Sequence, residues 1–258
     1  MSERREQVHE PVIDESIREA FEEQLKKGEG EGNRAVRGGA ARIARLLAIA
    51  YALFHLYTAA FGAFPNLIQR SIHVGFAMML AYILYTGSKR SRGTGRVPWY
   101  DWVLVAFSAL MAAYVSANYY RFTVDVTSST MVDLVMSALT LIVLLEASRR
   151  VIGWAFPILA VLFMLYAYYG RSLPMPWTHA GFEIRPLLEY LFMSTQGIWG
   201  VTTRITSTEV AIYIIFGAFL VVTGGGKTFM DLALLLAGRS VGGPAKVATV
   251  SSSFFGTI

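Results

Sequence analysis

The sequence lacks cysteine entirely and is poor in charged residues. Without cysteine, the 258-residue chain has no disulfide framework, no thiolate metal site and no cysteine nucleophile. Charged residues make up 16% of the chain and hydrophobic residues 54%, a balance outside the range of ordinary soluble domains. These shortages argue against a water-soluble enzyme.

The few charges that are present are unevenly distributed. Residues 1–33 hold 10 acidic and 5 basic residues, which leaves 8 acidic and 18 basic residues for 34–258. The net charge of +5 is therefore about −5 on a tail and about +10 on an apolar body. Because the later basic residues sit singly or in small clusters between uncharged segments, we expect no nucleic-acid surface.

Long uncharged segments predict an all-α polytopic membrane protein with about six transmembrane helices. Roughly 20 mostly apolar residues cross a bilayer core of about 30 Å as a helix. The predicted spans are 46–69, 71–88, 102–120, about 131–148, 151–170 and 210–226. The lipid bilayer is thus the first expected partner.

Basic residues in the connections predict a cytoplasmic N-terminus, because Lys and Arg near span ends stay on that side. One set of connections carries 13 basic residues and the other set 5. Residues 131–170 could form two spans or one long helix kinked near Pro157. The charge rule favours two spans, because a single span would place Lys227, Arg239 and Lys246 outside.

The tail and the polar residues inside the spans suggest structural roles. Ile13, Ile17, Phe21 and Leu25 recur every four residues, which predicts a short amphipathic helix before a Gly/Glu linker at 28–32. His55, His73 and Asn118 are interpreted as helix-packing or interfacial hydrogen-bonding groups, because none has a second ligand or acid at helical spacing.

One acidic residue has basic partners at helical spacing. Glu146 precedes Arg149 and Arg150 by three and four residues, which predicts a structural ion pair at the cytoplasmic boundary.

The C-terminal part differs from the simple spans. Residues 229–237 are too short to cross a membrane and predict a helical arm along the interface. A new helix-like run from Ala245 to Ile258 contains three consecutive serines, followed by Gly256 and Thr257. Small residues and hydroxyl groups suit a broken membrane helix whose freed groups face an ion or a substrate, although a serine-rich packing face is an equal alternative.

Six segments of the chain form a recognisable set of motifs, namely 54–62, 96–102, 145–155, 216–220, 242–248 and 254–258. Together they resemble fused permeases, with small and large membrane subunits, of tripartite ATP-independent periplasmic (TRAP) transporters. The resemblance is closest to the branch served by TAXI-type binding proteins and covers about residues 40–258. The string Gly243-Pro244-Ala245-Lys246 is its most specific part.

This resemblance implies a multi-pass protein of the bacterial inner membrane that acts as a sodium symporter. A periplasmic TAXI-type binding protein would deliver a C4-dicarboxylate or related organic acid. It divides the chain into a cytoplasmic acidic tail (1–40), a small-subunit-like four-helix scaffold (41–150), a connector helix with a periplasmic segment (151–206) and the start of a DctM-like transport domain (207–258). The last part would supply the first half of a re-entrant hairpin.

The resemblance also places a sodium ion near Gly256. The expected substrate or ion contacts are Ser251, Ser252, Ser253, Gly256 and Thr257. No other metal or cofactor is expected. In the family, a Ser-Gly-Ser hairpin tip follows the position of Ile258, so we expect the chain to be an N-terminal fragment or a truncated reading frame that is inactive alone.

Two other readings compete with the carrier. A stand-alone membrane scaffold or assembly subunit would also lack paired acids inside its spans. An intramembrane enzyme is the weakest alternative, because the spans contain no metal-ligand pair, no nucleophile with a base and no paired acids at helical spacing.

Overall fold

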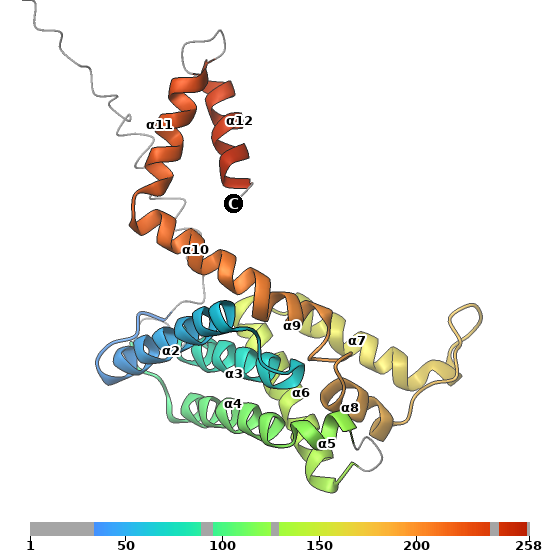
Figure 1. Ribbon diagram of the computed structural model, residues 1–258. Coiled ribbons are helices and arrows are strands. Elements are labelled where there is room, and N and C mark those ends of the chain that lie inside the picture. Colours follow the sequence, from blue (N-terminus) through green and yellow to red (C-terminus); the bar gives the residue numbers. More distant parts are fainter. Residues whose placement is uncertain (1–33, 89–94, 125–128, 238–242, 257–258) are drawn as a thin grey trace, which may run out of the picture.

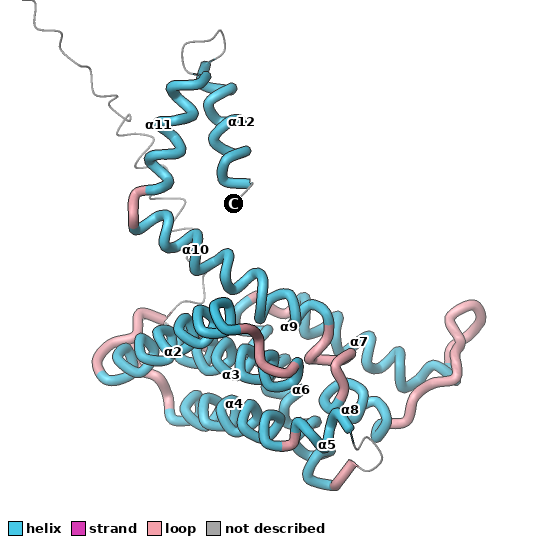
Figure 2. Tube along the Cα trace, viewed as in Figure 1, coloured by secondary structure: helices cyan, strands magenta, loops and turns pink. Residues whose placement is uncertain are grey.

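The computed structural model describes residues 34–88, 95–124, 129–237 and 243–256 (Figure 1). Within these ranges the chain forms helices and their connections, with no β-strand (Figure 2). The all-α prediction is therefore confirmed. The helices are α2 (Gly39–Phe61), α3 (Asn66–Leu84), α4 (Trp99–Ala117), α5 (Tyr119–Val124), α6 (Met131–Val151), α7 (Ala155–Tyr169), η2 (Gly170–Ser172), α8 (Ile184–Met193), α9 (Val201–Ile205), η3 (Thr206–Val210), α10 (Ala211–Val222), α11 (Gly225–Ala237) and α12 (Gly243–Gly256).

Within the described ranges, six helices are long and apolar enough to cross a membrane, as predicted. They are Gly39–Phe61, Asn66–Leu84, Trp99–Ala117, Met131–Val151, Ala155–Ser172 and Val201–Leu220. The predicted number of membrane-length helices is thus correct for the described residues, whereas several of the predicted helix ends are wrong.

The first and last spans begin earlier in the chain than predicted. The predicted spans started after the last charged residue, whereas α2 begins at Gly39 and includes Arg42 and Arg45. A charged residue near a span end can extend its head group toward water while its helix continues. The sixth span starts at Val201 for the same reason, since its helix continues through Arg204 and Glu209.

Residues 131–170 form two helices, which confirms the prediction drawn from the basic residues. α6 ends at Val151 and α7 begins at Ala155. Gly153 between them has φ 98°, a left-handed conformation that glycine adopts with little strain and that ends a helix. Pro157 lies in the first turn of α7, where a missing backbone N–H leaves no hydrogen bond unmade.

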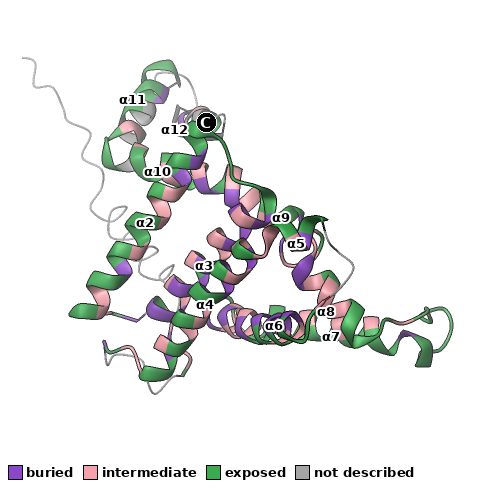
Figure 3. Ribbon diagram, turned by 60° about the horizontal axis from the view of Figure 1, so that its bottom comes forward, coloured by how far each residue is buried: buried purple, intermediate pink, exposed green. Residues whose placement is uncertain are grey.

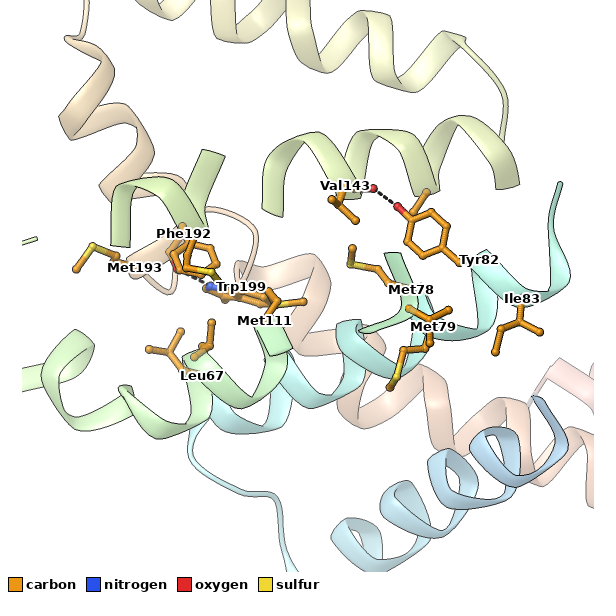
Figure 4. Close-up of a cluster of buried hydrophobic side chains, with 14 of the residues drawn as sticks. Leu67, Met78, Met79, Tyr82, Ile83, Met111, Val143, Phe192, Met193 and Trp199 are labelled. Carbon is orange, nitrogen blue, oxygen red and sulfur yellow. Dashed lines mark hydrogen bonds between the residues drawn. The ribbon is translucent and has the colours of Figure 1, made fainter. Parts of the chain in front are cut away.

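The buried core lies where α3, α4 and α6 meet the segment around α8 and α9. Leu67, Tyr82, Met111, Phe192 and Trp199 are nearly inaccessible to solvent. Figure 4 shows these side chains in one cluster, with the Tyr82 hydroxyl donating to the Val143 carbonyl. The Trp199 indole N–H donates to the Phe192 carbonyl, so both polar groups of the large aromatic residues are satisfied.

The outer faces of the bundle are apolar and exposed. α7 buries Pro157 and leaves most of its large side chains uncovered, among them Phe156, Leu162 and Phe163. Exposed residues also run along α2 and α10 (Figure 3). A helix that is hydrophobic all round and uncovered by protein is suited to contact lipid.

The C-terminal helices stand apart from this bundle (Figure 1). α10 leads away from it, and Gly224, at φ 78°, turns the chain into α11. α11 and α12 pack side by side through Ala233, Val247 and Val250. The predicted arm and hairpin segments are therefore helices, while their place in the membrane remains a prediction. The predicted tail helix and Gly/Glu linker lie outside the described residues.

A glycine contact between α3 and α4 provides a test of this packing. A Cβ on Gly75 would lie 2.7 Å from the Ala112 Cβ. Close helix contacts of this kind depend on small residues. We expect Gly75→Ala to destabilise the protein by about 1–3 kcal/mol through overpacking. Thermal unfolding in nanodiscs measures the effect.

Gly217→Ala is the matched control. Gly217 also lies in a helix, but nothing lies within 4 Å of its added Cβ. This variant should be neutral or more stable by up to about 1 kcal/mol, because alanine favours helix. Equal changes in the two variants would contradict the close α3–α4 packing.

Candidate functional site

The predicted ion pair at the end of α6 is present. Glu146 accepts two hydrogen bonds from Arg149, at 2.6 and 2.7 Å, and one from Arg150, at 2.7 Å. The three residues lie three and four positions apart, so their side chains share one face of the helix. The predicted structural pair is therefore confirmed.

The structure adds Asp101, which sequence reasoning did not assign to this cluster. One carboxylate oxygen of Asp101 accepts from Arg150 at 2.7 Å, and the other accepts from Arg34 at 2.6 Å. The side chains of Asp101 and Arg34 are fully buried. A buried carboxylate needs such partners, because an unpaired charge away from water is very costly.

The surroundings of this cluster join four helices at one end of the bundle. The backbone N–H of Arg34, which precedes α2, donates to the carbonyl of Leu84, the last residue of α3, at 2.7 Å. The Arg150 guanidinium lies 4.9 Å from the centre of the Tyr82 ring. We call the five residues Arg34, Asp101, Glu146, Arg149 and Arg150 the ion-pair end. Its charged groups are mutually bound, which suits it to holding helices together.

A second polar network closes the opposite end of the bundle. Asp133 accepts two hydrogen bonds from Arg121, at 2.6 and 2.7 Å, and one from Tyr114 at 2.6 Å. Asp133 also forms a capping box with Thr130 at the start of α6. The hydrogen bonds to Asp133 raise the pKa of the Arg121 guanidinium above its ordinary value. Arg121 therefore stays charged at every accessible pH.

The polar residues predicted to pack between helices do so. The amide group of Asn118 donates to the Tyr114 carbonyl at 2.9 Å and accepts from Arg121. His55 and His73 lie 3.1 Å apart, measured between His55 Nε2 and His73 Nδ1. Spacing within one helix could not predict that the two histidines meet, because they belong to different helices.

The predicted substrate or ion contacts lie at the end of α12. Ser251, Ser252 and Ser253 fall within the helix, and Gly256 is its last residue. Ser252 and Ser253 are exposed, and the Ser253 hydroxyl donates to the Thr249 carbonyl at 2.9 Å. Thr257 lies outside the described residues. Within the described ranges, no group of three or more acidic or histidine residues could hold a metal ion.

Contacts from α3 hold the start of the outgoing α9–η3–α10 segment. We call Gln69, Arg70, Trp199 and the η3 turn, which contains Ser207, the joint. η3 is a single π-helical turn, and such turns often occur at functional positions. The Gln69 amide donates to the Ser207 carbonyl at 3.0 Å, and Arg70 donates to the Trp199 carbonyl. α3 thus holds the backbone just before and within this segment.

An apolar cavity lies between α6, α7 and α8. It has a volume of about 810 Å³. Its lining includes Leu141, Leu144, Phe163, Met164 and Leu187. A carboxylate substrate needs positively charged or hydrogen-bonding partners, and of the lining residues only Tyr190 carries a hydrogen-bonding side chain and none is basic. The lining therefore suits an apolar ligand better than an organic acid.

The ion-pair end provides a second test. Asp101→Asn removes the negative charge between two buried guanidinium groups, and breaking a buried pair in this way costs about 3–5 kcal/mol. We expect a corresponding loss in the free energy of unfolding, measured with denaturant in detergent micelles.

Arg185→Gln is the control for Asp101→Asn. Arg185 pairs with Glu189 at 3.1 Å, but its side chain is 59% exposed. An exposed pair contributes up to about 1 kcal/mol, so this variant should lose much less stability. Similar losses in both variants would show that Asp101 does not bind the helix ends together.

Comparison with known proteins gives one family match. Residues 139–258 match the model of the "Tripartite ATP-independent periplasmic transporter, DctM component". No curated protein and no solved structure matches the chain. The match begins within α6 and extends through α12, so it includes the joint and the α11–α12 pair. From α6 onward, the chain is therefore similar to the large membrane component of a TRAP transporter.

Proposed function

We propose that this protein is the membrane permease component of a sodium-driven, binding-protein-dependent secondary transporter of the TRAP type. Its substrates would be C4-dicarboxylates or related organic acids. The match of residues 139–258 to the DctM component carries this proposal. Six membrane-length helices and the apolar outer faces of the bundle support it.

The proposal assigns different tasks to the two parts of the chain. The helices from α2 to α6 would be a small-subunit-like scaffold fused to the large component, and α7 would be the connector. The two hydrogen-bonded ends of the bundle support a fixed role for the scaffold, since each joins several helices. A periplasmic binding protein, of the TAXI type, would deliver the substrate.

The α11–α12 pair would belong to the moving transport domain. It lies apart from the bundle and is reached through Gly224, whose backbone conformation suits a turn between helices. Ser251, Ser252, Ser253, Gly256 and Thr257 would contact sodium or substrate. Hydroxyl and carbonyl oxygens at a helix end are suitable ligands for a sodium ion.

Gene deletion in the native host tests the proposed transport. We expect loss of sodium-dependent uptake of radiolabelled C4-dicarboxylates, with recovery when the gene is restored. Uptake by the restored strain should fall when potassium replaces sodium outside the cell. Uptake that survives deletion, or that continues unchanged without sodium, would contradict the proposal.

A scaffold or assembly subunit is the second candidate, because both ends of the bundle are closed by internal pairs. In that case residues 1–258 expressed alone would be stable and would co-purify with a separate large permease. The carrier proposal instead expects uptake to depend on residues 243–258 of this chain.

Thr257→Leu tests the proposed contact at the end of α12. In cells carrying the restored gene, loss of the hydroxyl should lower sodium-driven uptake by about tenfold, the equivalent of one hydrogen bond. Thr228→Leu is the control, because Thr228 is an exposed threonine on α11. Unchanged uptake in Thr257→Leu, with normal amounts of protein in the membrane, would remove this helix end from the site.

A further inference from the structure

Three polar side chains converge between α2 and α3. Tyr51 and His55 are four residues apart on α2, and His73 faces them from α3. The Tyr51 hydroxyl lies 2.8 Å from His73 Nδ1, and His55 Nε2 lies 3.1 Å from the same atom. His73 Nδ1 is therefore the meeting point of the cluster.

This cluster lies inside the membrane-length part of both helices. His55 and His73 are each at least six residues from the nearest helix end, which is about 9 Å along a helix. His55 is 2% exposed. Ionisable groups at such depth are costly and usually have a function.

His55 has one nitrogen without a hydrogen-bond partner. Its Nδ1 is buried and unpaired. The Ser207 backbone, whose carbonyl accepts from Gln69, lies beside the His55 ring. A neutral His55 that donates through Nε2 leaves the Nδ1 lone pair buried without a partner. A proton on Nδ1 would give the ring a second donor beside the Ser207 backbone, which offers a carbonyl acceptor.

The contact between the two rings also favours a single proton. One nitrogen must donate and the other must accept, and a charged donor makes this hydrogen bond stronger. A second proton, on His73 Nδ1, would remove the acceptor and place two positive charges about 3 Å apart. The pair should therefore bind one proton and reject another, as closely spaced carboxylates share one.

We propose that His55 and His73 form a proton-binding site within the membrane, with His55 as the protonated ring and His73 as its acceptor. The site lies at the joint, because Gln69, one turn before His73 on α3, binds the π-helical turn. Proton uptake by His55 adds a donor from α2 toward the same turn. This inference does not depend on the proposed transport function.

None of the ion pairs in the described residues involves His55 or His73. The ionisable residues on the elements around the pair include Tyr51 on α2, Arg70 on α3, Arg204 on α9 and Glu209 on η3. Of these four, Tyr51 alone hydrogen-bonds to the pair in the described part of the chain. His73 also lines a cavity of about 400 Å³ beside Thr203 and Thr206.

Nitrogen-15 NMR of histidine-labelled protein in lipid nanodiscs tests the proposal directly. The chain has 4 histidines, so the background variant His9→Gln/His179→Gln leaves only the pair visible. The titration runs from about pH 8 to about pH 4, which brackets the ordinary histidine pKa of about 6.5. We expect the two rings together to gain one proton, on His55, while His73 stays neutral.

Three results would overturn the proposal: both rings become charged, neither becomes charged while the protein remains folded, or His73 takes the proton. His73→Gln should still permit protonation of His55, because the glutamine carbonyl can accept the same hydrogen bond. Loss of His55 titration in that variant, with the fold intact by circular dichroism, would also count against it.

Tyr51→Phe separates a proton site from mere helix packing. The Tyr51 hydroxyl competes with His55 for the lone pair of His73 Nδ1. Its removal should shift the one-proton titration to higher pH, because His73 then accepts from His55 alone. An unchanged midpoint, or a shift to lower pH, would contradict the assignment of His73 as acceptor.

Discussion

The buried carboxylate of Asp101 binds two guanidinium groups that lie far apart in the chain. Arg34 precedes α2 and Arg150 lies at the end of α6, so one side chain at the start of α4 aligns the ends of three helices. Arg34 also donates to a carbonyl at the end of α3. Both side chains of the Arg34–Asp101 pair are buried away from water, so these charges must find partners within the protein. This requirement determines which ends of the first helices lie side by side.

A second set of buried polar contacts closes the opposite end of the bundle, where Asp133 joins α6 to Arg121 and Tyr114. Between the two closures the helices meet through small residues, as at Gly75 and Ala112, and through a few hydrogen bonds. The polar groups at the ends determine which helices are neighbours, and the apolar surfaces determine how closely they approach. A bundle closed at both ends changes shape less readily than one closed at a single end.

Hydropathy and charge predicted the number of membrane-length helices found in the described residues, because the bilayer imposes the same length and polarity on every span. They did not predict the helix ends, since Arg42 and Arg204 lie on helices that continue past them. Glu146, Arg149 and Arg150 were predictable because they are local. Asp101 was not, although Arg34, Asp101 and Arg150 all lie near span ends predicted to be cytoplasmic. The histidine pair was missed because its two members lie on different helices, and spacing within one helix cannot reveal such contacts.

The joint differs from both closures in the kind of contact that it makes. Gln69 and Arg70 hold carbonyl groups of the Trp199–Ser207 segment, not side chains. π-Helical turns occur mostly as single turns inside α-helices, often at functional sites. A proton on His55 would add a donor from α2 toward the same turn that Gln69 binds. The proposed proton site therefore lies where the chain leaves the bundle for α10, whereas the ion-pair end and the Asp133 network bind side chains of the bundle itself.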